Sequence, residues 1–252
     1  MAVAKLAPKL DGELHSPIVE LRHYTLHPGR RDDLISLFDT YFVEGQESCG
    51  MKIIGQFRDI DDPDAFVWLR GFDDMQARHD ALTAFYDGPV WAAHRDAANE
   101  TMIDSDDVLL LHPVGDDGGF VLPPERLGLL PDDISSAIIE AVTYKLKAPA
   151  EAGFRAFYER VLSPILHAPC EHKVALLTTE HSPNTFTRLP VRLGENVVVV
   201  FSRFESVDAQ LAFSELLRDS PAWQTARQQL SNYLIAPPLI ARLSPTARSL
   251  LR

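Results

Sequence analysis

The chain has 252 residues, enough for one large domain or for two domains that each bury a core. Its 36 acidic and 24 basic side chains give a net charge of −12, which argues against nucleic acid or an anionic membrane as a partner. No apolar run approaches the roughly 18 residues of a membrane helix, and two cysteines make no disulfide framework. We therefore expect a cytoplasmic protein whose partner is small or neutral.

The first elements in chain order are a strand, a helix and a hairpin. Residues 18–26 are rich in β-branched and aromatic side chains and stop at a Pro-Gly turn, which predicts a strand. Apolar residues at helical spacing over 34–42 predict a helix. The turn signal DDPD at 61–64 separates two apolar segments, 51–60 and 65–72, which predicts an antiparallel hairpin.

A helix, a second short helix and a strand complete the unit. Residues 73–86 have a helical pattern, and Pro89 stands where a new helix begins, because proline is tolerated in a first helical turn. Residues 104–113 predict the last strand. The order is β-α-β-β-α-β, that of a ferredoxin-like unit.

The second half of the chain repeats this order. Glu20 and Tyr24 recur as Glu140 and Tyr144, an offset of 120 residues, and DGPVWAAHR at 87–95 returns as DSPAWQTAR at 219–227. The offset grows near HSPNTFTRLPVRLG, which predicts a longer hairpin loop in the second copy; the last strand is expected over 232–243. The expected division is a tail 1–16, a first unit 17–115, a linker 116–135, a second unit 136–246 and a tail 247–252.

Each antiparallel sheet carries helices on one face and needs a second sheet to cover the other face. We therefore expect an α+β fold in which two tandem ferredoxin-like units pack their sheets face to face. A monomer is possible, and leftover sheet edges make a homodimer the slightly commoner outcome.

Three motifs of the first half carry a resemblance to a known family. ELRHYTLHPG at 20–29, GMKIIGQF at 50–57 and Pro-Val-Trp at 89–91 resemble the NIPSNAP family of the dimeric α/β-barrel superfamily, over about 17–113. The resemblance implies a two-sheet barrel with pockets between sheet and helices. It implies little chemistry, because the superfamily includes cofactor-free oxygenases, haem enzymes, isomerases and members with no assigned reaction.

Motifs for cofactors and metals are missing from the sequence. It has no dinucleotide or phosphate-binding glycine loop, no nucleophile elbow and no HExxH zinc motif. We therefore expect no cofactor: no flavin, no nicotinamide and no structural zinc. Cys49 and Cys170 occupy matching positions, where a small apolar residue at the edge of the core is a simpler interpretation than a catalytic thiol.

The first strand carries the main polar cluster. Alternation places Glu20, Arg22 and Tyr24 on one face, and Trp68 and Arg70 share a face of the strand expected beside it. If this face is buried, Glu20 and Arg22 must be paired, because an isolated buried charge is costly. Aromatic walls with an arginine suit an organic acid or a flat ring. A structural ion pair and ordinary packing are the alternatives.

Helical residues would line the opposite side of this pocket. Arg78 and His79 lie on the helix over 73–86, Tyr86 ends it, and His94 lies on the next helix. Histidine is the natural acid or base near neutral pH, and a haem or metal role is the less favoured alternative. Trp91 recurs at 223, which favours a packing role.

The sequence therefore predicts a small-organic-molecule site in the first half. The candidate catalytic residues are His79, His94 and Glu20, and the candidate substrate-binding residues are Arg22, Tyr24, Trp68, Arg70, Arg78 and Tyr86. The chemistry would be cofactor-independent proton transfer or oxygenation. A non-catalytic binding, scaffold or regulatory protein is the alternative. The second half has Val142, Val200, Ser202 and Gln210 at the positions of Arg22, Trp68, Arg70 and Arg78, and is expected chiefly to complete the barrel.

Overall fold

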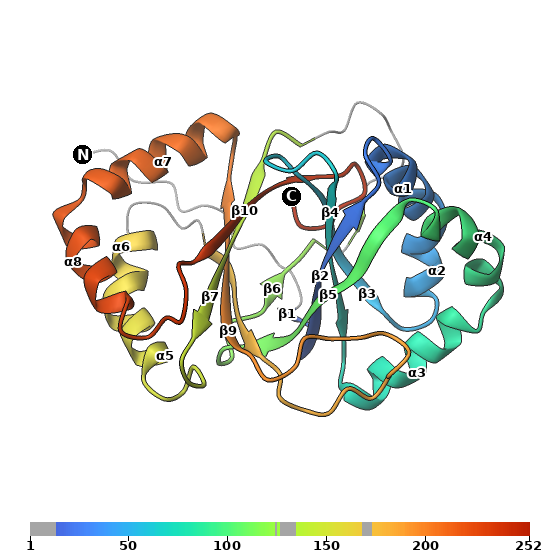
Figure 1. Cartoon of the computed structure of the whole chain (residues 1–252), viewed down its shortest axis with the longest axis horizontal. Helices are drawn as coiled ribbons and strands as arrows, with labels where there is room; N and C mark the ends of the chain where they lie inside the picture. Colours follow the sequence, from blue (N-terminus) through green and yellow to red (C-terminus); the bar gives the residue numbers. More distant parts are fainter. Residues whose placement is uncertain (1–13, 124, 127–134, 168–172) are drawn as a thin grey trace.

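The computed structural model of the protein describes residues 14–123, 125–126, 135–167 and 173–252 (Figure 1). The strands of the first half are β2 (Ile18–Leu26), β3 (Lys52–Asp59), β4 (Ala65–Phe72) and β5 (Met102–Pro113). Its helices are α1 (Arg31–Leu37), α2 (Val43–Glu47), α3 (Met75–Tyr86) and α4 (Pro89–Asn99), with a π-helical turn over Phe38–Phe42 between α1 and α2.

The second half has the same order of elements. Its strands are β7 (Ile138–Leu146), β8 (Lys173–Thr179), β9 (Asn196–Phe204) and β10 (Leu239–Pro245). Its helices are α5 (Phe154–Phe157), α6 (Ser163–His167), α7 (Val207–Asp219) and α8 (Pro221–Leu230), and a π-helical turn over Tyr158–Leu162 joins α5 to α6. Two short strands, β1 (Leu14–His15) and β6 (Phe120–Val121), pair with each other.

The strands of both halves form one closed antiparallel barrel in the order β10-β3-β4-β2-β5-β8-β9-β7. Each half contributes four neighbouring strands with ferredoxin-like connections, which confirms the predicted fold class. The halves meet where β5 pairs with β8 and where β10 pairs with β3. The barrel therefore has no unpaired edge, because each half uses the edges of the other, so the barrel offers no leftover edge of the kind from which we expected dimerisation. A monomer or a homodimer stays a prediction.

Local sequence explains where several helices and strands begin. The Asp74 side chain accepts a hydrogen bond of 2.7 Å from the Ala77 amide and caps α3, and Pro89 opens α4. The strand expected over 232–243 begins only at Leu239. Pro237 and Pro238 precede it, and proline has no N–H to donate to a sheet.

The inside of the barrel is a packed apolar core, and the helices of the two halves cover its opposite sides (Figure 1). Val19 of β2 points into this core, whereas Glu20 on the same strand points outward to the helices of the first half. Phe120 and Leu251, which come from the expected linker and the expected C-terminal tail, are also buried in the core. In the described part of the chain no helix is long and apolar enough to cross a membrane.

Candidate functional site

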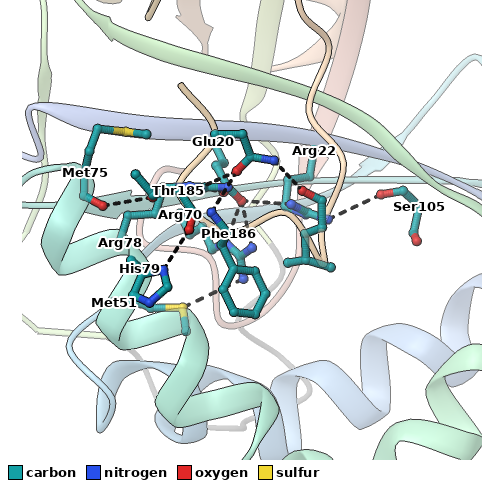
Figure 2. A network of polar contacts seen from close by, with 12 residues as sticks. Glu20, Arg22, Met51, Arg70, Met75, Arg78, His79, Ser105, Thr185 and Phe186 are labelled. Carbon is teal, nitrogen blue, oxygen red and sulfur yellow. Dashed lines mark hydrogen bonds and ion pairs between the residues drawn. The ribbon is translucent and has the colours of Figure 1, made fainter. Parts of the chain in front are cut away.

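A buried carboxylate with three arginines lies between the sheet and the helices of the first half (Figure 2). Glu20 accepts hydrogen bonds of 2.8 Å from Arg22 Nη1, 2.8 Å from Arg70 Nε and 2.7 Å from Arg78 Nε. Each of the four side chains is at most 1% exposed. We call these four residues the Glu20 cluster.

The Glu20 cluster is the result of strand register and helix packing. Glu20 of β2 lies directly beside Arg70 of β4, Arg22 follows two residues later on the same face, and Arg78 reaches in from α3. Burial raises the pKa of Glu20, but the attraction of the three guanidinium groups outweighs it and holds the pKa well below its ordinary value. A carboxylate held ionised in this way is a poor proton acceptor. The geometry favours the structural pairing over a catalytic role for Glu20.

Aromatic side chains complete the packing around the cluster. The guanidinium carbons of Arg22 and Arg70 lie 5.4 and 5.0 Å from the centre of the Trp68 ring, and the Tyr24 hydroxyl accepts a hydrogen bond of 3.0 Å from Arg22 Nε. The cavity left among these aromatic residues, bounded on one side by Tyr86, has a volume of about 30 Å³. That volume suits ordered water and is too small for an organic molecule. The expected first-half pocket is filled by the side chains predicted to line it.

The loop over 180–195, between β8 and β9, crosses from the second half and closes this region from outside. Asn184 Oδ1 accepts a hydrogen bond of 3.0 Å from Arg78 Nη1, and the Thr185 carbonyl lies 2.7 Å from His79 Nδ1. Phe186 follows Thr185 in this loop and lies close to His79 (Figure 2). Its ring is 5% exposed and stacks on Tyr86 with 5.9 Å between ring centres. The longer hairpin loop that the sequence predicts is therefore part of the first-half core.

The two candidate histidines contact different neighbours. His79 of α3 contacts the loop residues Thr185 and Phe186, whereas His94 of α4 stacks on Tyr41 with 3.9 Å between ring centres. Neither forms a hydrogen bond with Glu20. The catalytic roles of His79 and His94 and the substrate-binding roles of the other candidates stay predictions. Cys49 is half-buried at the edge of the first-half core, and Cys170 lies outside the described residues.

A larger cavity lies at the corresponding place in the second half, between the sheet and helices α7 and α8. Its volume is about 240 Å³, close to the lower end of the roughly 300–1,000 Å³ typical of small-molecule sites. We call it the second-half cavity. It is lined by Glu140, Val142, Tyr144, Leu166, Val200, Ser202, Phe213, Ser214, Leu217, Arg218, Trp223, Gln224, Arg227, Pro238 and Ile240.

This cavity exists because small side chains replace large ones. Val142, Val200 and Ser202 stand at positions that match Arg22, Trp68 and Arg70 in the first half. The volume of the three large side chains is therefore missing from the space between sheet and helices. Comparison of the two halves of the sequence reveals these differences, from which we expected the second half chiefly to complete the barrel. Their effect on volume is the signal that points to a cavity.

Glu140 is the ionisable group on the sheet side of the second-half cavity. It lies beside Ser202 of β9 and Arg242 of β10, and its Oε2 accepts a hydrogen bond from Gln210 Nε2 of α7. Burial raises the pKa of Glu140, and the hydrogen bond from Gln210 and the charge of Arg242 offset only part of that effect. No arginine forms an ion pair with Glu140 in the described chain. Glu140, unlike Glu20, is suited to accept and return a proton.

Comparison with known proteins places this arrangement in a known fold. The fold is similar to that of a candidate monooxygenase from Fusobacterium nucleatum (TM-score 0.57, 10% identity, 92% of this chain and 93% of that chain covered). It is also similar to a candidate monooxygenase from Lactobacillus acidophilus (TM-score 0.52, 12% identity, 91% and 94% covered) and to an anthrone oxidase-like protein (TM-score 0.52, 11% identity, 93% and 92% covered). At these identities the likeness is one of fold alone.

The family comparison concerns the first half. No match was found among curated protein sequences. The NIPSNAP family model matches residues 19–116, which run from the start of β2 to just beyond β5 and include the whole Glu20 cluster. This match confirms the family resemblance given by the motifs at 20–29, 50–57 and 89–91. Residues 19–116 thus match the NIPSNAP family, and their four strands form half of an eight-stranded α/β barrel.

Proposed function

We propose that the protein binds a small organic molecule in the second-half cavity and that Glu140 transfers a proton to or from it. The observation that carries this proposal is the coincidence of an apolar cavity of about 240 Å³ with a carboxylate whose pKa is raised by burial. Proton transfer needs no cofactor. With dioxygen as a co-reactant, removal of a proton from an activated C–H bond would also open a route to oxygenation.

The contrast between the two halves supports this location. In the first half, Glu20 is neutralised by three arginines, and the cavity between the sheet and the helices is about 30 Å³. A ligand in the first-half site predicted from the sequence would have to displace Phe186 or Tyr86. We infer that the first half stabilises the barrel and that the second half holds the ligand, the reverse of the sequence-based expectation.

The alternative of a scaffold without a ligand predicts packed space in both halves. The second-half cavity is lined mainly by apolar side chains and has a carboxylate and two serines on its walls. An apolar cavity with a few polar groups is the usual form of a small-molecule site. Binding of a small molecule is therefore favoured over a purely structural role, and the Glu140→Gln variant separates catalysis from binding.

The test is mass spectrometry of small molecules that co-purify with the native protein, compared with two variants that fill the cavity. Val200→Trp introduces the side chain found at Trp68. Leu217→Trp narrows the cavity from α7, and because Leu217 is half-buried, the larger side chain should disturb the packing of the core less. We expect a molecule that is lost from both folded variants. Retention of every co-purified molecule in both variants would contradict the proposal. In an assay with the identified molecule, Glu140→Gln should retain binding and lose turnover.

A further inference from the structure

The polar groups of the second-half cavity are distributed unevenly. Glu140 and Ser202 lie on the sheet side, and Ser214 of α7 accepts a hydrogen bond of 3.0 Å from Gln210 Nε2, the group that also donates to Glu140. Arg218 and Arg227 line the cavity from α7 and α8 and are exposed to solvent. One side of the cavity thus carries a half-buried acid, and the rim carries two cations.

The middle of the cavity is apolar. Val142, Val200 and Tyr144 line it from the sheet, and Leu217 and Trp223 line it from the helices. Flat rings stack well on aromatic side chains and gain free energy by leaving water. This part of the cavity suits the apolar body of a ligand, most simply an aromatic one.

The rim arginines are available to a ligand. Within the described residues, no acidic group or hydrogen-bond acceptor pairs with the Arg227 guanidinium. Among the described residues, Arg218 makes only long, exposed ion pairs, 3.8 Å from Glu215 and 3.5 Å from Asp219. Solvent-exposed pairs of this kind contribute little free energy, so a ligand anion can compete for Arg218. The net charge of the chain is −12, so the two arginines make the cavity rim locally positive on a negatively charged protein and can attract an anion to it.

We propose that the ligand of the second-half cavity is an organic anion with an aromatic body, held with its anionic group at Arg218 and Arg227 and a hydrogen-bonding group toward Glu140. This inference rests on the proposed function and specifies its ligand class. The orientation follows from charge: a carboxylate or sulfonate is repelled by Glu140 and attracted by the arginines. A hydroxyl or N–H at the other end of the ligand can donate to Glu140.

Two fluorescent dyes test the charge requirement directly. 8-Anilinonaphthalene-1-sulfonate carries a sulfonate, and N-phenyl-1-naphthylamine has the same aromatic body and N–H without that anionic group. We expect the sulfonate dye to bind more tightly to the wild-type protein. Arg227→Gln should weaken its binding roughly three- to five-fold, as for a partly exposed ion pair, and leave the neutral dye unchanged. Raising the salt concentration should reduce the advantage of the sulfonate dye.

The chain offers a matched control for the arginine and a separate control for the place of binding. Arg95 of α4 is the first-half counterpart of Arg227 and, in the part of the chain that the structure describes, pairs only with Asp96 at 3.4 Å. Arg95→Gln should therefore change the binding of neither dye. Leu217→Trp should weaken both dyes. Equal binding of both dyes in wild type, unchanged by Arg227→Gln, would overturn the anion inference and leave the proposed function standing. If Leu217→Trp and Val200→Trp affected neither dye, the dyes would bind elsewhere and both proposals would fail.

Discussion

Replacing Glu20 with glutamine should destabilise the fold strongly, whereas the same replacement at Glu140 should not. The two carboxylates occupy matching positions on β2 and β7. Glu20→Gln leaves three buried guanidinium groups without their counter-charge, whereas Glu140→Gln removes an acid whose ionised form is disfavoured by burial.

The structure sets the size of the effect. Breaking a buried ion pair by removing one partner costs roughly 3–5 kcal/mol, and Glu20 partners three arginines that are at most 1% exposed. We therefore expect a loss of about 4 kcal/mol or more, out of a total free energy of unfolding of roughly 5–15 kcal/mol. For a chain of this size, such a loss lowers Tm by roughly 8–16 °C.

The two variants should also differ in their dependence on pH. The folded-state pKa of Glu20 is lowered, so its stabilisation is fully present above the unfolded pKa of about 4.5 and is lost as pH falls below it. The folded-state pKa of Glu140 is raised, so ionisation of the unfolded chain makes wild type less stable as pH rises above about 4.5. Glu140→Gln removes that decrease and should be at least as stable as wild type at pH 7.5.

Urea unfolding at pH 5 and pH 7.5, followed by tryptophan fluorescence, measures both variants against wild type. A loss below about 1 kcal/mol for Glu20→Gln would refute the view that the Glu20 cluster is a buried, mutually dependent network. Equal losses of unfolding free energy in Glu20→Gln and Glu140→Gln would refute the view that Glu20 is held by its arginines whereas Glu140 is not.

Three further perturbations test other parts of the structure. Burial raises the pKa of Asp39 to about 6, so this residue should make wild type less stable as pH rises from about 4 to 6, and Asp39→Asn should reduce that fall in urea titrations. Phe186→Ala should cost roughly 3–5 kcal/mol and create space in the first half, detected as a larger increase in Tm with benzoate than wild type shows; an increase no larger than that of wild type would mean that the first half has no latent site. Gly71→Ala would place a methyl group 2.1 Å from Ser16 Oγ and should cost roughly 1–3 kcal/mol of stability. Adding Ser16→Gly to this variant removes the clashing side chain at a position with a φ of 66°, where glycine is favoured, and should restore most of the Tm. If the Tm were not restored, the strain would lie elsewhere.

The sequence by itself determined the fold class and the possibility of a buried Glu20–Arg22 pair. The strands at 18–26 and 65–72 were predicted to the residue, because alternation, turn signals and proline positions are local properties of the chain. Alternation also placed Glu20 and Arg22 on one face of their strand, and the cost of a buried charge required these two to be paired if that face is buried, as it is. Closure of the barrel through β5–β8 and β10–β3 was not predicted, because no local pattern encodes pairing between distant edges.

Only the tertiary structure decided which half has room for a ligand. The residues that suggested a first-half site, Arg22, Trp68 and Arg70, are the ones that fill it, and Phe186 reaches the same region from a loop in the other half. Val200 and its neighbours leave the second-half cavity open. A cavity is the difference between the volume that the backbone encloses and the volume of all the side chains that enter it. Contributions to that difference come from residues more than one hundred positions apart, so periodicity and composition cannot supply it.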